Sequence, residues 1–129
     1  MSSTFEMNAL LAGLAFIVLM AAALRKAPPW QVFALLGAGF AGWSVNAVVT
    51  EGPLGFWPEH IRNAWGNQIW FDLLLAAAIA WTVLVPRLRA AGMHPLPWLV
   101  FVVCTGSIGL CATVARCLFL ESRVRETGR

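Results

Sequence analysis

The sequence predicts an all-α protein, a four-transmembrane-helix bundle with short loops, on three observations. First, 60% of the 129 residues are hydrophobic and only 12% are charged, with a mean hydropathy of +0.75. A soluble domain carries about 25% charged residues, so this chain has too little charge to cover a surface that faces water. Second, the apolar residues form four long blocks without Asp, Glu, Lys or Arg: 9–24, 32–49, 73–85 and 99–115. Third, the blocks are rich in Ala and Leu and do not alternate with period two, which argues against strands.

Each block reaches the length of a membrane span once its interfacial ends are added. A span needs roughly 20 mostly apolar residues at about 1.5 Å each. We therefore expect a single integral membrane domain over residues 1–129, with helices at about 6–24, 30–49, 67–86 and 98–120. The first block contains "MAAAL", which resembles a small-residue cleavage site, but no positive charge precedes it and "RK" follows it. We therefore expect the first helix to be retained rather than cleaved.

The breaks between the predicted helices are well marked. The first helix ends at "RKAPPW" (25–30), where two prolines allow the second helix to begin. Residues 50–66 form the longest connection and are aromatic enough to lie in the membrane interface. Proline closes the third helix and opens the fourth within "PRLRAAGMHPLPW" (86–98). Residues 121–129 form a charged tail.

The positive charges beside the helix ends bear on orientation. With four spans, one side of the membrane holds four cations and no acid: Arg25, Lys26, Arg87 and Arg89. The other side holds five glutamates and four arginines: Arg62, Arg123, Arg125 and Arg129. The Lys/Arg count, the established guide to orientation, is equal on the two sides. We expect the first set in the cytoplasm, because its charges flank the spans tightly in two short loops, so that both termini lie outside; dual insertion is the alternative.

Three of the predicted helices place a polar side chain at one depth near the outer surface: Asn46, Asp72 and Arg116. Asp72 lies about 7.5 Å inside its helix end and Arg116 about 6 Å inside its own. Each ends a ridge of small residues, the kind along which membrane helices approach closely. An unpaired charge costs at least about 2.5–3.5 kcal/mol at the bilayer centre and less toward its surface. The sequence therefore predicts an ion pair between Asp72 and Arg116.

This polar cluster has two interpretations. It is a structural ion pair, or it is a site at the outer leaflet for a polar headgroup, a quinone-like ring or an ion. In the second case Trp57, Trp65 and Trp70 would form an aromatic lid over it. Tryptophan is typical of the headgroup level.

Other chemistry finds little support in the sequence. No Ser/His/Asp set, paired carboxylate or phosphate-binding loop can be assembled, and "GAGFAG" (37–42) follows no strand, so packing explains its glycines. The three cysteines share the last block without metal-ligand spacing, and His60 and His94 lie in loops on opposite sides. We expect no metal, no cofactor and no nucleic-acid partner, and nothing indicates a catalytic residue.

From about residue 54 to 125 the chain resembles a bacterial family of small polytopic membrane proteins known only as a domain of unknown function. The resemblance rests on an aromatic stretch running into "WFDLLLAAAIAW", a basic loop with "RLRAAGMHPLPW" and a last segment with "TGSIGLCATVARCLFLESR". The matching positions are the aromatic pair before Asp72, Arg87 and Arg89 with Gly92-Met93, and Gly106-Ser107. Residues 1–53 lie largely outside the resemblance, and Arg116 is not carried over. The resemblance implies a basic inner loop in a bacterial inner membrane, and it supplies no activity.

Three functions are compatible with these observations. The first is an accessory or structural subunit, or a homo-oligomer, that acts through helix packing with itself, other membrane subunits and the lipid bilayer. The second is a binder or enzyme of lipids, isoprenoids or quinones that uses the outer polar cluster. The third is a small transporter or channel, which at this size would have to oligomerise.

Overall fold

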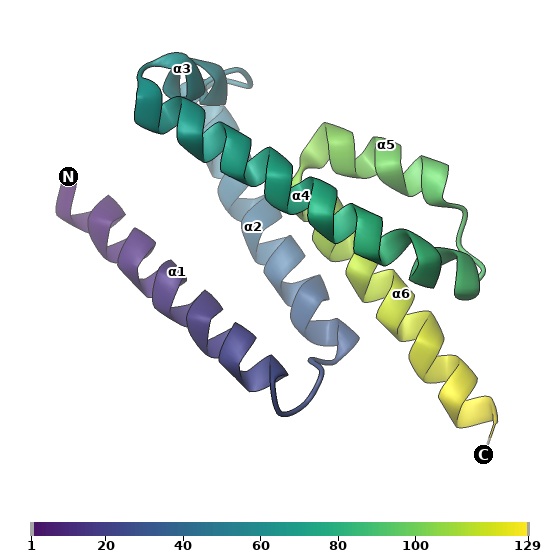
Figure 1. Ribbon diagram of the computed structural model, residues 1–129. Coiled ribbons are helices and arrows are strands. Elements are labelled where there is room, and N and C mark those ends of the chain that lie inside the picture. The colour runs from purple at the N-terminus through teal and green to yellow at the C-terminus, as the bar shows by residue number, and fades with distance from the viewer. Residues whose placement is uncertain (1, 129) are drawn as a thin grey trace.

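The computed structural model describes residues 2–128 and is all-α, as predicted. Figure 1 shows the six helices of this part of the chain in order: α1 (Ser2–Ala23), α2 (Trp30–Glu51), α3 (Phe56–Ile61), α4 (Ala64–Ala90), α5 (Pro95–Thr105) and α6 (Ser107–Thr127). No strand occurs between residues 2 and 128. The helices run up and down as long rods, and α3 is a short turn of helix between α2 and α4.

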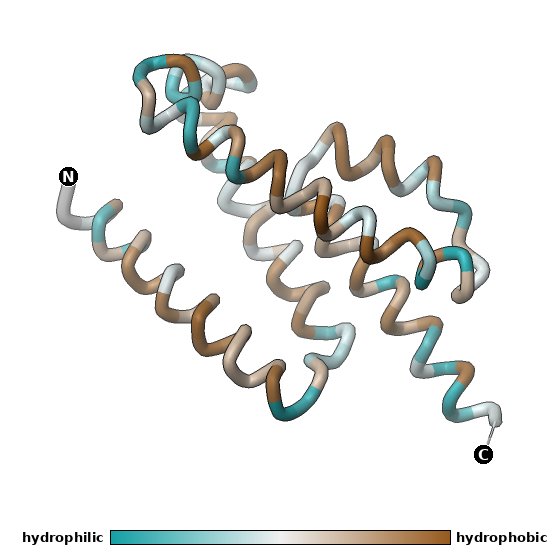
Figure 2. The backbone as a smooth tube through the Cα atoms, viewed as in Figure 1, coloured by the Kyte–Doolittle hydropathy of each residue, from teal (hydrophilic) through white to brown (hydrophobic). Residues whose placement is uncertain are grey.

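Three helices are long and apolar enough to cross a membrane, by their length and composition. They are α1 over Thr4–Ala23, α2 and α4, and they correspond to the first three predicted spans. Figure 2 shows hydrophobic residues along the middle of these helices and hydrophilic ones at the turns between them. α4 is longer than predicted, since it begins at Ala64 instead of 67 and continues past Pro86 to Ala90.

The end of α4 is set by glycine and not by the proline that the sequence suggested. Gly92 has a φ of +73°, a left-handed conformation that favours glycine. Its N–H donates to the carbonyl of Arg89, and the Met93 N–H donates to the carbonyl of Leu88 at 2.9 Å. This is the Schellman pattern of helix termination. Leu88 and Met93 also belong to the same buried cluster, so the turn is held by packing as well.

The fourth predicted span, 98–120, is not one helix, and this corrects the expected four-helix bundle. The chain breaks at Gly106, where φ is +60° and ψ is −126°, a conformation that residues with a side chain rarely adopt. α5 has 11 residues and is therefore about 16 Å long, roughly half of a bilayer's hydrocarbon core. α6 then turns back and packs against α5. A Cβ on Gly109 would lie 2.7 Å from the carbonyl oxygen of Phe101, so glycine permits this close approach.

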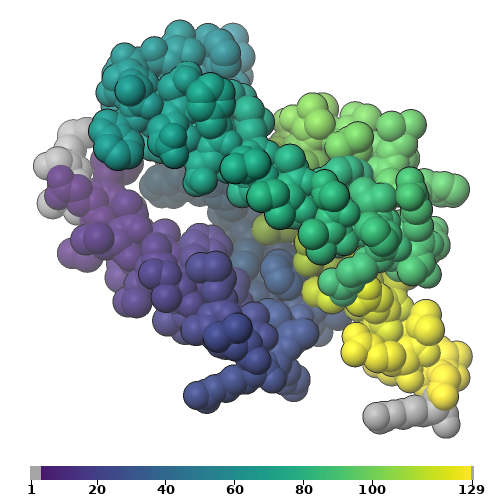
Figure 3. Space-filling view, viewed as in Figure 1, coloured from purple at the N-terminus to yellow at the C-terminus, as the bar shows by residue number. Residues whose placement is uncertain are grey.

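α6 is the centre of the packing. It contacts α2, α4 and α5, whereas α2 and α4 make no contact with each other. The buried core lies where α4, α6 and the turn after α4 meet, and it is formed by Leu84, Leu88, Met93 and Cys117. α1 packs against no other helix within residues 2–128, and Figure 3 shows open space between its middle and α4.

One end of the molecule gathers most of the cations; we call it the basic end. Trp30 at the start of α2 meets Phe119 of α6 edge-to-face at 5.4 Å. Arg87 near the end of α4 meets Glu121 of α6. The start of α2 and the ends of α4 and α6 therefore lie together, with six cations near them: Arg25, Lys26, Arg87, Arg89, Arg123 and Arg125. The sequence analysis placed the charged tail on the side of the membrane opposite the 87–95 loop. Because the chain turns back at Gly106, the tail lies beside that loop instead.

Candidate functional site

The structure does not bring Asn46, Asp72 and Arg116 together. All three side chains are exposed, and the ion pairs among residues 2–128 are Arg62 with Glu59 and Arg87 with Glu121. The predicted ion pair between Asp72 and Arg116 is therefore not formed. The Arg116 guanidinium instead lies 5.7 Å from the centre of the Phe119 ring, a cation–π distance.

The separation of Asp72 and Arg116 follows from the direction of α6. Asp72 precedes Arg87 by 15 residues, or about 22 Å of helix, and Arg116 precedes Glu121 by five residues, or about 7.5 Å. Because Arg87 and Glu121 are in contact, the two charges differ by about 15 Å in level. The prediction of one shared depth assumed that 98–120 crosses as a single helix antiparallel to 67–86.

The predicted aromatic lid is formed in part. Trp57 of α3 and Trp70 of α4 lie edge-to-face at 6.5 Å, and His60 stacks on Trp70 at 4.8 Å. Trp65 is 77% exposed and takes no part in this group. Since the aromatic group lies at the end of α4 away from Arg87, it does not cover Arg116.

The hairpin of α3 and α4 that carries these aromatics has a clear local cause. The Asn63 side chain caps α4, because its Oδ1 accepts a hydrogen bond from the Gly66 N–H at 2.8 Å. A Cβ on Gly66 would collide with the carbonyl oxygen of Glu59, so only glycine allows α3 to lie this close to α4. The arrangement fixes an aromatic surface at the end of the molecule opposite the basic end.

A different pair of charges, which sequence reasoning missed, joins α4 to α6. Arg87 donates from Nε to Glu121 Oε1 at 3.0 Å and from Nη2 to Glu121 Oε2 at 2.7 Å. The thiol of Cys117, buried among the core residues, donates to Glu121 Oε1 at 3.6 Å. The pKa of Glu121 lies below its ordinary value, mainly because its carboxylate accepts hydrogen bonds from Arg87. Both charges end apolar blocks in the sequence, but four crossing helices would have placed them on opposite sides.

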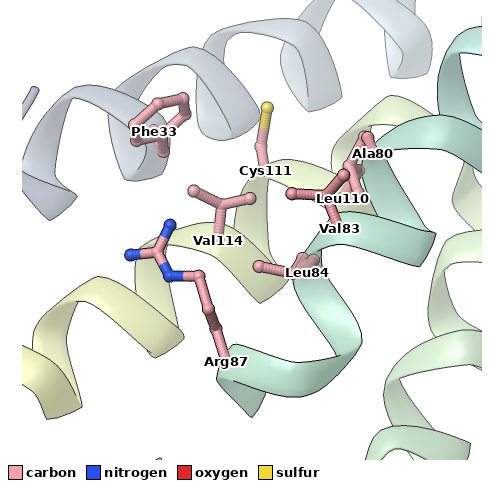
Figure 4. A pocket seen from close by; sticks show the side chains of 8 residues that line it. All are labelled: Phe33, Ala80, Val83, Leu84, Arg87, Leu110, Cys111 and Val114. Atoms are coloured by element: carbon pink, nitrogen blue, oxygen red, sulfur yellow. The ribbon is translucent and has the colours of Figure 1, made fainter. Parts of the chain in front are cut away.

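A groove runs from this pair along the molecule between α2 and α4, with α6 as its floor. Its volume is about 450 Å³. The lining is apolar except for one residue, and it consists of Phe33, Ala80, Val83, Leu84, Arg87, Leu110, Cys111 and Val114. Figure 4 shows these side chains around the groove, with Arg87 reaching from α4 toward Phe33. The groove exists because α2 and α4 both pack on α6 without touching each other.

The described residues include no group of three or more His, Cys, Asp or Glu side chains that could hold a metal ion. The three cysteines are free thiols: Cys104 is exposed, Cys111 is half-buried and Cys117 is buried.

Comparisons with protein-family models, curated proteins and solved structures gave no match to the chain. The resemblance to a membrane family of unknown function therefore stays a prediction.

Proposed function

We propose that the protein is a small integral membrane protein that acts through helix packing, as a homo-oligomer or as an accessory subunit of another membrane protein. The observation that carries this proposal is α1. Its residues 9–23 are all apolar and it is long enough to span a membrane, yet it packs against no other helix between residues 2 and 128. A helix that contributes nothing to its own bundle is available to a partner.

The exposed faces of α1 and α2 have the composition of membrane helix interfaces. Ala9 and Gly13 lie four residues apart on α1, and a Cβ on Gly13 would meet nothing within 4 Å. On α2, Ala38, Gly42 and Asn46 follow one another at spacings of four and are exposed. Small residues at this spacing let membrane helices approach closely, and an amide can hydrogen-bond across the interface.

We also propose that the basic end faces the cytoplasm of a bacterial inner membrane, with the N-terminus outside and the C-terminus inside. The distribution of charge supports this orientation: six Lys and Arg residues lie near the basic end, and Arg62 is the cation of the opposite end among residues 2–128. Lys and Arg concentrate in cytoplasmic loops. Four full spans would instead give equal Lys and Arg counts on the two sides of the membrane and would place both termini outside.

Photo-crosslinking in native membranes tests the packing proposal. A photoreactive amino acid at Gly13 of α1 should give an adduct with a second copy, at twice the 14.0-kDa mass of the chain, or with one defined membrane protein. The same group at Ile79, which is exposed on α4, is the matched control and should give mainly lipid adducts. If Gly13 also yields only lipid adducts, α1 has no protein partner and the proposal is wrong.

A second candidate, a small oligomeric transporter or channel, is favoured by the break at Gly106. Interrupted helices inside a membrane often line the substrate or ion path of transporters. Ion flux through proteoliposomes that contain the whole chain tests it, with Gly106→Ala and Asp72→Asn as variants. Flux that is absent, or that neither variant changes, would rule against this candidate.

A further inference from the structure

We propose that the groove between α2 and α4 binds one acyl chain of an anionic phospholipid, with the lipid phosphate at Arg87. This proposal rests on the membrane orientation proposed above and is independent of the role proposed for α1. It concerns the basic end and not the polar residues Asn46, Asp72 and Arg116 that the sequence singled out.

The shape of the groove suits an amphiphile. Seven of its eight lining residues are apolar, and the charged one, Arg87, lies at one end. From Ala80 to Arg87 the groove follows α4 for seven residues, or about 10 Å. Its volume of about 450 Å³ falls in the usual range of ligand sites, about 300–1,000 Å³. A ligand that fits therefore has an apolar part that fills about this length and one polar end.

Arg87 can bind an anion although it is paired with Glu121. A guanidinium has five N–H donors, and Glu121 occupies one on Nε and one on Nη2. The remaining donors lie on Nη1 and Nη2, and the Arg87 side chain is 50% exposed. Glu121 therefore leaves donors of Arg87 free for an anion at the end of the groove.

The surrounding charge favours an anionic headgroup. Near the basic end six cationic side chains face two acidic ones, Glu121 and Glu126. Trp30, the first residue of α2, packs on Phe119 and is the kind of side chain that lies at the headgroup level. Basic pockets between membrane helices on the cytoplasmic side are typical binding sites for anionic lipid headgroups.

A second copy of α1 is the competing occupant, and charge disfavours it. The only acidic residue of α1 is Glu6, at the end far from Arg87, whereas Arg25 and Lys26 follow α1 at the basic end. An α1 helix in the groove with the same orientation would bring two cations toward Arg87. A lipid phosphate brings the opposite charge.

Native mass spectrometry of the full chain in detergent, titrated with dioleoyl phosphatidylglycerol or dioleoyl phosphatidylcholine, tests the proposal. We expect the anionic lipid to bind about tenfold tighter, as a charge-assisted hydrogen bond would give. The double variant Arg87→Gln/Glu121→Gln, which leaves no unpaired charge, should lose this preference. Arg89→Gln, two residues away in no ion pair among residues 2–128, should keep it. Equal loss in both variants would mean diffuse attraction to the basic end and would overturn the site.

Two further variants separate binding from folding. Glu121→Gln alone frees donors on Arg87 and should tighten phosphatidylglycerol binding severalfold, whereas a purely structural role of the pair predicts weaker binding. Ala80→Phe fills the groove and should weaken both lipids, while Ala78→Phe, at an exposed position of the same helix, should not. Unchanged binding by Ala80→Phe, or a second chain found in place of lipid, would overturn the proposal. If the chain is instead extracted from membranes by alkaline carbonate, the proposed membrane insertion fails and not the groove alone.

Discussion

Removing either charge of the Arg87–Glu121 pair should destabilise the fold by more than the loss of an ordinary surface charge. Exposed ion pairs contribute about 0.2–1 kcal/mol, and breaking a fully buried pair costs about 3–5 kcal/mol. The Glu121 side chain is 27% exposed and the Arg87 side chain 50%, and the pair is bidentate. Between these limits we expect a coupling energy of about 1–2 kcal/mol.

The assay is a double-mutant cycle of Arg87→Gln, Glu121→Gln and the double variant, read as free energies of unfolding in mild detergent. The cycle isolates the pair from the other contacts of each side chain. Arg89→Gln is the matched control and should change the free energy of unfolding by no more than about 0.5 kcal/mol. A coupling energy below about 0.3 kcal/mol, or an equal loss in Arg89→Gln, would refute the contact between α4 and α6 at this point.

Three further predictions follow from the packing and charges. Gly109→Ala should lower the free energy of unfolding by about 1–3 kcal/mol, because its Cβ would meet the backbone of α5; Gly39→Ala, with open space around it, should be neutral or slightly stabilising in the same measurement. Asp72→Asn and Arg116→Gln should be additive within about 0.5 kcal/mol in a double-mutant cycle, and a clear coupling would restore the ion pair that the sequence predicted. Arg87 lowers the pKa of Glu121 in the folded protein. The stabilisation from this pair should therefore be present above about pH 4.3, the pKa of glutamate in the unfolded chain, and be lost as the pH falls through the lower folded pKa. Glu121→Gln should flatten that part of the curve of unfolding free energy against pH.

The helices of the first three spans could be predicted from the sequence because their signal is local. Long blocks without charge set α1, α2 and α4, and the predicted starts and ends differ by only a few residues from Ser2–Ala23, Trp30–Glu51 and Ala64–Ala90. For the last apolar block the same reasoning was wrong, because this block forms two helices and not one. The segments 99–104 and 108–112 on the two sides of Gly106 are apolar and uncharged, so hydropathy alone cannot distinguish one crossing helix from two helices that fold back on each other.

The candidate site depended on that one glycine. Once α6 returns beside the end of α4, Arg87 meets Glu121, and Asp72 and Arg116 fall about 15 Å apart in level. The ridge of small residues that ends at Asn46 was expected to pack against the other helices, yet its members Ala38 and Gly42 are exposed. Such pairings depend on the direction and rotation of whole helices, and neither can be deduced from the spacing of residues within one helix. The aromatic group was predicted better, because Trp57 and Trp70 are joined by a short hairpin.

The central claim is that α5 and α6 form a hairpin, so that the tail lies on the same side of the membrane as the loop between α1 and α2. The most direct test is labelling of single introduced cysteines by a membrane-impermeant maleimide in intact and in lysed cells, with the native chain as background. Leu54→Cys should be labelled in intact cells, and Ala27→Cys and Gly128→Cys only after lysis. Labelling of Ala27→Cys and Gly128→Cys from opposite sides of the membrane would contradict the hairpin and restore a fourth crossing.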